Sequence, residues 1–207
     1  MEVKVKNRGW VKNAAIIFLA IMLVLTFFSN TFMNHSLAEV ATQSVTSGSI
    51  TAKVRGTGIA KRSPEYVKQK MIEHKAVLAL YKKTTFAGFS YIECWSNKTF
   101  VANSGLIVAP DFRGLGLAKR IKRRIFELSR EMFPEAKIFS LTTGEAVMKM
   151  NNELGYRPVT FPSLTDDEAF WRGCESCVNF DILQRNGRRM CLCTGMLYDP
   201  AEHKDEQ

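Results

Sequence analysis

The sequence predicts an α/β (α+β) domain with a mixed central sheet, preceded by one transmembrane helix. An uncharged, largely apolar run occupies residues 14–33, three strand-like runs follow one another between residues 76 and 109, and a glycine-containing turn at 114–116 opens a basic helix. The first observation predicts the membrane segment. The other two predict an antiparallel sheet followed by helices that cover it.

The composition is that of a globular protein with an excess of positive charge. The chain has 207 residues, 46% of them hydrophobic, with 13 Gly and 6 Pro, which excludes collagen-like, low-complexity and wholly disordered proteins. Its formal net charge of +9 suits anionic partners such as phosphates, nucleic acid or an acidic membrane surface. No aromatic-interleaved groove accompanies the basic residues, so we expect no nucleic-acid partner.

The N-terminal run predicts a membrane anchor over residues 1–33. The 20 residues from Ala14 to Met33 carry no charge, and about 20 are needed to cross a hydrocarbon core of about 30 Å as a helix. Basic residues precede the run and none follows before Lys53, which predicts a single-pass protein with a cytoplasmic N-terminus. A long signal peptide cleaved after Ala38 is the alternative.

Residues 34–58 are predicted to be an extended linker rich in Ser and Thr. The segments VKNAAIIFLAIMLVLTFFSN (residues 11–30) and EVATQSVTSGSITAKVRGTG (residues 39–58) resemble the N-terminus of HlyD-like periplasmic adaptor proteins of export pumps. In that family one anchor leads into a β-rich body, which does not follow here. The resemblance therefore implies an anchor without an activity, and we expect a fusion junction near residues 54–58.

Residues 59–163 are predicted to form the core of the domain. Ser63 is placed as the N-cap of a helix that has Pro64 in its first turn and runs to about His74. Apolar and alternating runs predict an antiparallel meander, and the apolar spacing then becomes helical. The expected elements are strands at 76–83, 86–95 and 99–109, a helix at 117–131, a strand at 137–143, a helix at 145–154 closed by Gly155, and a last strand at 156–161.

The junction VAPDFRGLGLAKR, residues 108–120, is the sharpest local signal. A strand enters a turn that opens a basic helix, and the first N–H groups of a helix lack intrahelical acceptors. Gly114 and Gly116 allow a bulky anion to approach these groups closely. The junction therefore predicts a pyrophosphate site, with a plain strand-to-helix connection as the alternative.

Arg113, Gly116 and Ala118 match R-x-x-G-x-A, and with the order of elements around them they resemble the GNAT superfamily of N-acetyltransferases. The resemblance implies the acyl-CoA N-acyltransferase fold, here lacking its usual first strand. It implies that backbone groups of Leu106, Ile107 and Val108 hold the pantetheine arm and acyl carbonyl of acetyl-CoA or succinyl-CoA. The pyrophosphate would be held by residues Arg113, Gly114, Leu115, Gly116, Leu117, Ala118 and Lys119.

Two residues are candidates for the proton transfers of acyl transfer. Many members of that family place a Tyr four residues before the glycine that closes the last core helix, where it protonates the leaving thiol. Asn151 occupies that position here. Glu93, on the predicted second strand of the meander, is the candidate base acting through water, and an exposed structural carboxylate is the alternative.

The C-terminal extension, residues 164–207, carries Cys174, Cys177, Cys191 and Cys193. Four thiolates at this spacing could close a tetrahedral zinc site. Reduced structural thiols and disulfides are the alternatives.

The segments FWRGCESCVNFDIL and CLCTGMLYDP resemble amino-acid N-acyltransferases of Bacteroidetes-type bacteria. This implies acetyl or succinyl transfer to an amino-acid amine, with glutamate in arginine biosynthesis as the suggested acceptor. Arg157, Lys61 and Arg62 are candidates to hold the acceptor carboxylate. The rival interpretation is a non-enzymatic membrane protein, in which an adaptor-type anchor carries a defective coenzyme-binding module. Coenzyme A belongs in the cytoplasm, where that acetyltransferase family works. The basic residues before the apolar run instead predict that the domain after it is exported.

Overall fold

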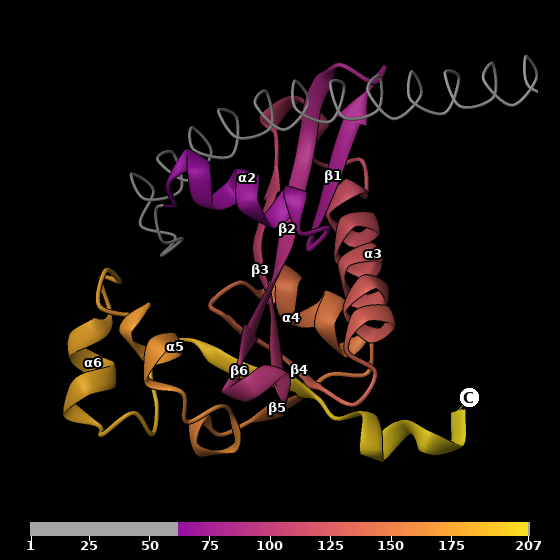
Figure 1. The fold of residues 1–207 in the computed structure, drawn as a ribbon. Coiled ribbons are helices and arrows are strands. Elements are labelled where there is room, and N and C mark those ends of the chain that lie inside the picture. Colours follow the sequence, from indigo (N-terminus) through magenta and orange to yellow (C-terminus); the bar gives the residue numbers. More distant parts are fainter. Residues whose placement is uncertain (1–61, 207) are drawn as a thin grey trace, which may run out of the picture. The chain divides into compact units, whose positions relative to one another are not determined.

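The computed structural model describes residues 62–206, which form a sheet with helices packed around it (Figure 1). The elements are α2 Pro64–Ile72, β1 Ala76–Tyr81, β2 Thr85–Trp95, β3 Phe100–Val108, α3 Leu117–Met132, β4 Lys137–Thr142, α4 Glu145–Asn152, β5 Arg157–Val159, α5 Glu168–Arg172, α6 Phe180–Arg185 and β6 Thr194–Tyr198. Short 3₁₀ turns occur at Ser96–Lys98, Pro110–Phe112, Phe161–Ser163 and Pro200–Glu206.

The described strands form one mixed sheet in the order β1-β2-β3-β4-β6-β5. The β1–β2 and β2–β3 pairs are antiparallel, β3–β4 is parallel, and β6 pairs antiparallel with both β4 and β5. The predicted meander and mixed sheet are confirmed. The strand predicted at 156–161 forms over Arg157–Val159 as β5, but it is not the last strand, because β6, from the C-terminal extension, inserts between β4 and β5.

Local sequence signals explain where the helices begin and how they face the sheet. Ser63 Oγ accepts the backbone N–H of Tyr66 at 3.2 Å, as the N-cap prediction requires. On α3, Ile121 and Ile125 are buried against the sheet. Lys122 of the same helix is also buried, although its place in the basic run predicted an exposed face.

Hydrophobic side chains cover both faces of the sheet, because successive residues of a strand point to opposite sides. Ile92 packs with Ile125 of α3, whereas Phe89 and Tyr91 pack with Val67 of α2. The helices α2 and α3 therefore lie on opposite faces of the β1–β3 half of the sheet (Figure 1).

None of the helices within residues 62–206 is long and apolar enough to cross a membrane. The predicted anchor, linker and fusion junction all lie outside the described residues. The first strand expected of the acyltransferase fold is not found within residues 62–206, where β1 is the edge of the sheet.

Candidate active site

The sheet splits between β3 and β4. The two strands pair only from Phe100 to Ala102, and within residues 62–206 no strand covers that edge of β3 beyond Ala102. The free edge therefore presents backbone N–H and C=O groups that a ligand can pair with. The predicted ligand-binding residues Leu106, Ile107 and Val108 lie on this stretch.

A β-bulge marks the free edge. The register between β2 and β3 shifts between Phe89 and Tyr91, opposite the stretch of β3 that contains Gly105. Gly105 has φ +64°, and a Cβ there would lie 2.4 Å from the ring of Tyr91. Only glycine fits this position, so the bulge is specified by the sequence.

The strand continues through the Pro110–Phe112 turn into the N-terminus of α3. The first N–H to enter the helical pattern is that of Arg120, which bonds to Gly116 O at 3.3 Å. The six N–H groups of residues 114–119 have no acceptor among the described residues. Gly114 and Gly116 have φ of +75° and +72°, with no described atom within 4 Å of where a Cβ would be. This row of donors, at the positive end of a 16-residue helix, is suited to bind an anion.

Two side chains of the predicted pyrophosphate site hold the turn in place. Arg113 donates from Nε to the carbonyl of Val108 at 3.1 Å, which ties the turn to the end of β3. Lys119 forms an ion pair of 2.6 Å with Glu153, just after α4. Both charged side chains therefore contact the protein itself, and the backbone N–H groups of the turn are left available as donors.

A separate groove of about 710 Å³ runs along α3 on the side of β1. Leu115, Leu117 and Arg120 line it, together with residues of β1, but its lining contains no residue of β3 or β4. The groove therefore flanks the turn without being part of the split.

Glu93 lies at the base of the split, because it pairs in register with Ala102, the last residue at which β3 contacts β4. Its Oε2 is 2.6 Å from Lys70 Nζ of α2, and its Oε1 has no hydrogen-bond partner among the described residues. Burial raises the pKa of Glu93 to about 7, with the charge of Arg62 opposing this, and burial lowers the pKa of Lys70. The alternative of an exposed strand carboxylate is therefore wrong for this residue.

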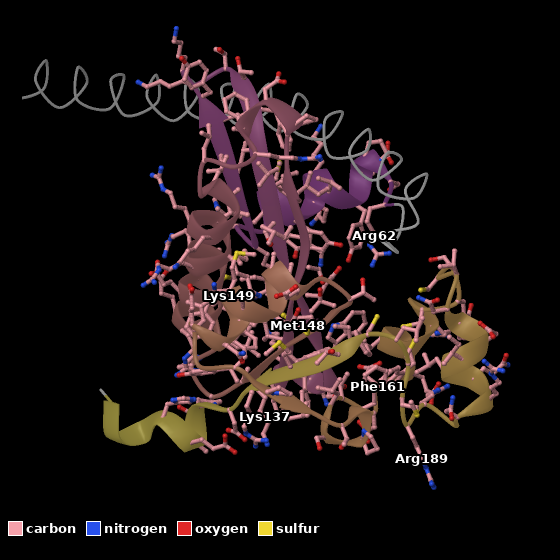
Figure 2. All side chains as sticks on the ribbon, turned by 180° about the vertical axis from the view of Figure 1, so that it is seen from behind. Arg62, Lys137, Met148, Lys149, Phe161 and Arg189 are labelled. Atoms are coloured by element: carbon pink, nitrogen blue, oxygen red, sulfur yellow. The ribbon has the colours of Figure 1, made fainter. Side chains whose placement is uncertain are left out.

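Of the candidates for an acceptor carboxylate, Arg62 lies on the same face as Glu93. It donates from Nε to the hydroxyl of Tyr91 at 3.1 Å, its guanidinium lies over the ring of Tyr66, and Figure 2 shows it beside α2. Arg157 donates instead to Glu202 at 2.8 Å, so its guanidinium is engaged at the C-terminal turn. Lys61 lies outside the described residues.

Comparison with solved structures identifies the fold. N-acetylglutamate synthase from Neisseria gonorrhoeae, complexed with coenzyme A and N-acetyl-glutamate, is similar over 76% of this chain and 32% of its own, with a TM-score of 0.54 and 15% identity. The GNAT phosphinothricin acetyltransferase from Sinorhizobium meliloti, in complex with AcCoA, matches 77% of this chain and 83% of its own, with a TM-score of 0.52 and 14% identity. The fold is that of the GNAT acetyltransferases.

A third structure, the ribosomal-protein-alanine N-acetyltransferase from Brucella melitensis, matches 78% of this chain and 95% of its own, with a TM-score of 0.53 and 12% identity. The chain thus spans about a third of the synthase and most of the other two proteins. No family model matches the sequence. No curated protein matches it either.

Asn151 lies on α4, four residues before Gly155, whose φ of +85° ends the helical segment. The side chain is fully buried. Its Nδ2 donates to Met196 Sδ at 3.6 Å, while its Oδ1 has no partner among the described residues. A carboxamide does not lose a proton at neutral pH, so Asn151 cannot protonate a thiolate as a tyrosine hydroxyl would.

A polar cluster behind the split was not predicted from the sequence. We define it as Asn103, Lys122, Ser129 and Tyr156. Asn103, the first residue of β3 beyond its pairing with β4, donates to Ser129 Oγ at 2.8 Å and accepts from Tyr156 Oη at 3.0 Å. Lys122 Nζ lies 3.4 Å from the same Asn103 oxygen and 4.9 Å from the centre of the Tyr156 ring. Burial lowers the pKa of Lys122 to about 7.

The four cysteines of the C-terminal extension come together. Cys174 and Cys177 lie in the turn between α5 and α6, and Cys191 and Cys193 lie in the loop before β6. All four are unpaired and line one cavity of about 30 Å³. Among residues 62–206, no three His, Cys, Asp or Glu side chains are arranged as a metal-ligand set.

Proposed function

We propose that the chain is an acyl-CoA-dependent N-acyltransferase. The observation that carries the proposal is the continuity between the free edge of β3 and the six N–H groups of residues 114–119, which have no acceptor within residues 62–206. A thioester carrier has the same two parts in the same order: an amide-containing arm that can pair with a strand, and a pyrophosphate that suits a helix N-terminus.

In this proposal the backbone of Leu106, Ile107 and Val108 holds the pantetheine arm and the acyl carbonyl. The N–H groups of residues 114–119 hold the pyrophosphate. The acceptor amine attacks the carbonyl carbon, the C–N bond forms, and the C–S bond breaks. Holding both reactants in this geometry supplies much of the rate.

Glu93 is the proposed base. An amine must be neutral to attack, and a carboxylate with a pKa near neutrality is suited to remove its proton through water. Lys70 holds Glu93 in place and favours its charged form. The leaving thiolate takes its proton from water, because Asn151 has none to give.

The proposed acceptor is an amino acid. Arg62, on the face of Glu93, offers the charge and donors that a carboxylate requires. The similarity to a synthase whose structure contains N-acetyl-glutamate supports glutamate as the first acceptor to test. Acetyl-CoA and succinyl-CoA are the donors to compare.

Asn151 favours a second candidate, a coenzyme-binding membrane protein without turnover. Such a protein would bind acyl-CoA in the same split but lack the side-chain acid of the related enzymes. The predicted anchor at residues 14–33 would make it single-pass. Fractionation of cells expressing the full chain, with a reporter fused after Gln207, tests both the membrane location and the side of the C-terminus.

The function is tested by thiol release from acetyl-CoA and succinyl-CoA, using the full chain and a panel of amino acids. Turnover with one acceptor supports the enzyme, and coenzyme binding without turnover supports the second candidate. Gly116→Asp should raise the KM for acyl-CoA more than about tenfold, because the new carboxylate repels the pyrophosphate.

Gly187→Asp is the matched control for this variant. Gly187 also has positive φ, +57°, and no described atom within 4 Å of where a Cβ would be, but it lies after α6. Equal effects of the two substitutions would contradict the proposed pyrophosphate site.

A further inference from the structure

The cavity in the C-terminal extension is lined by four thiols that belong to two separate segments. Its volume of about 30 Å³ is enough for one water-sized occupant and too small for an organic ligand. The thiol-bearing segments are 13 residues apart in sequence, between Cys177 and Cys191. The fold, rather than local spacing alone, therefore brings the two cysteine pairs to one place.

Hydrogen bonds hold these segments together around the cavity. The thiol of Cys191 lies 3.7 Å from the carbonyl of Asn179 and donates to it. The backbone N–H of Asn179 donates to Cys177 Sγ at 3.5 Å. One residue, Asn179, thus links a member of each pair.

All four thiols line the same cavity, from the turn between α5 and α6 and from the loop before β6. In the described structure no three of them are arranged as a metal-ligand set, so holding one cation requires their side chains to turn toward it.

The extension has little regular structure to stabilise it. Its helices α5 and α6 contain only 5 and 6 residues, which is too short to be stable without tertiary support. Trp171 and Leu183 pack against Phe139 of the sheet, but the turn between α5 and α6 and the loop before β6 have no strand partner among the described residues. A cross-link at the cavity would fix both segments at once.

We propose that Cys174, Cys177, Cys191 and Cys193 bind one structural zinc ion that fastens the C-terminal extension to the sheet. Four cysteine ligands fill the tetrahedral coordination that zinc prefers, so the ion has a structural role without an open position. All four cysteines lie on turns or loops, where their side chains can rotate about χ1 to close on one ion. Binding releases the thiol protons and leaves four zinc–sulfur bonds, with no change in oxidation state.

The test is metal analysis of the full chain, purified without chelator. We expect about one zinc per chain, and a mercurial should release that zinc as it forms bonds to the four cysteine sulfurs. The double variant Cys174→Ser/Cys193→Ser should lose the zinc. Cys94→Ser is the matched control, because Cys94 is a free, half-buried thiol of β2 outside the cavity, and it should retain the zinc.

If the double variant does not fold, the absorption spectrum of the wild-type chain loaded with cobalt is measured instead. The wild-type chain reconstituted with Co²⁺ should show the intense visible and sulfur-to-metal charge-transfer bands of tetrahedral thiolate cobalt. A chain with no stoichiometric zinc and four reactive thiols would overturn the proposal. Disulfides between these cysteines, detected by mass spectrometry of the freshly purified chain, would overturn it equally. None of these measurements depends on acyl transfer.

Discussion

The ammonium of Lys70 lies 2.6 Å from Glu93 Oε2 and joins α2 to the base of the split between β3 and β4. Both side chains are mostly buried, at 13% and 8% exposure. Burying a charge is costly unless a partner compensates for it. A buried carboxylate with one oxygen lacking a described partner, at the base of the split, is the feature on which the proposed chemistry depends.

Removing Glu93 should remove the base. With Glu93→Gln, kcat/KM should fall by about 10²–10⁴, while acyl-CoA binding is retained. In the wild type, activity should rise with pH around a midpoint near the Glu93 pKa of about 7, because only the deprotonated carboxylate accepts a proton. A pH–rate profile measures both effects, and an unchanged acid limb in Glu93→Gln would exclude this residue as the base.

Removing Lys70 should shift that acid limb rather than abolish it. Lys70→Met removes the opposite charge, so the pKa of Glu93 rises and the midpoint moves to higher pH. The variant should also be less stable, because it leaves a buried carboxylate without its partner. Lys68→Met serves as the control, since Lys68 lies on the same helix and makes no ion pair with a described residue.

Gly105→Ala should disrupt the bulge on the free edge of β3. The new Cβ would lie 2.4 Å from the ring of Tyr91 at a φ of +64°, so the strand must shift, at a cost of about 1–3 kcal/mol in the free energy of unfolding. Acyl-CoA binding should weaken with it. Gly187→Ala shares the positive φ without the clash, and chemical denaturation of both variants separates strain from steric conflict.

Lys122→Met should stabilise the protein and remove a pH dependence. Burial lowers the Lys122 pKa from 10.5 to about 7, so between these pH values the unfolded chain binds more protons than the folded one. Stability therefore rises with pH across this range, by at most about 1.4 kcal/mol per pH unit. The full penalty is present below pH 7, where both states are charged.

In Lys122→Met this slope should be absent, and stability at neutral pH should increase. The oxygen of Asn103 keeps the hydroxyl of Tyr156 at 3.0 Å as its donor, so the substitution leaves that oxygen satisfied. Urea unfolding from pH 6 to 10 measures the slope. Parallel pH profiles of variant and wild type would show that Lys122 remains charged in the folded protein.

Arg113→Met should weaken acyl-CoA binding indirectly. The lost bond from Arg113 Nε to Val108 O, 3.1 Å long, frees the turn that carries the N–H donors. A hydrogen bond of this kind contributes about 0.5–1.5 kcal/mol, so the KM for acyl-CoA should rise by about 2–12-fold with kcat unchanged. Arg185→Met, which removes an exposed pair with Asp181, should leave the KM unaltered.

The local signals of the sequence predicted most elements of the described region. The helix at Pro64–Ile72, the meander and the amphipathic helix at Leu117–Met132 follow from capping residues and apolar spacing, which act over a few neighbours. The glycines of the turn were predicted to leave room for an anion, and no described atom lies within 4 Å of where a Cβ of Gly114 or Gly116 would be. These features need no information from distant parts of the chain.

Long-range pairing was not predictable in the same way. β6 begins at Thr194, 35 residues after β5 ends at Val159, and its partners on β4, such as Ile138 and Leu141, are still further away in sequence. The Lys70–Glu93 pair and the burial of Lys122 depend on which helix face meets the sheet. A basic run looks the same in the sequence whether or not one of its members is buried.

The central claim is that backbone amides at the start of α3 hold the pyrophosphate of an acyl carrier. Calorimetric titration of the full chain with coenzyme A and, separately, with pantetheine tests it most directly, because pantetheine keeps the arm and lacks the phosphates. The account predicts that coenzyme A binds at least about a hundredfold more tightly, since charge-assisted hydrogen bonds contribute about 1.5–3 kcal/mol each. Equal affinity for the two compounds, or no binding of coenzyme A, would contradict it.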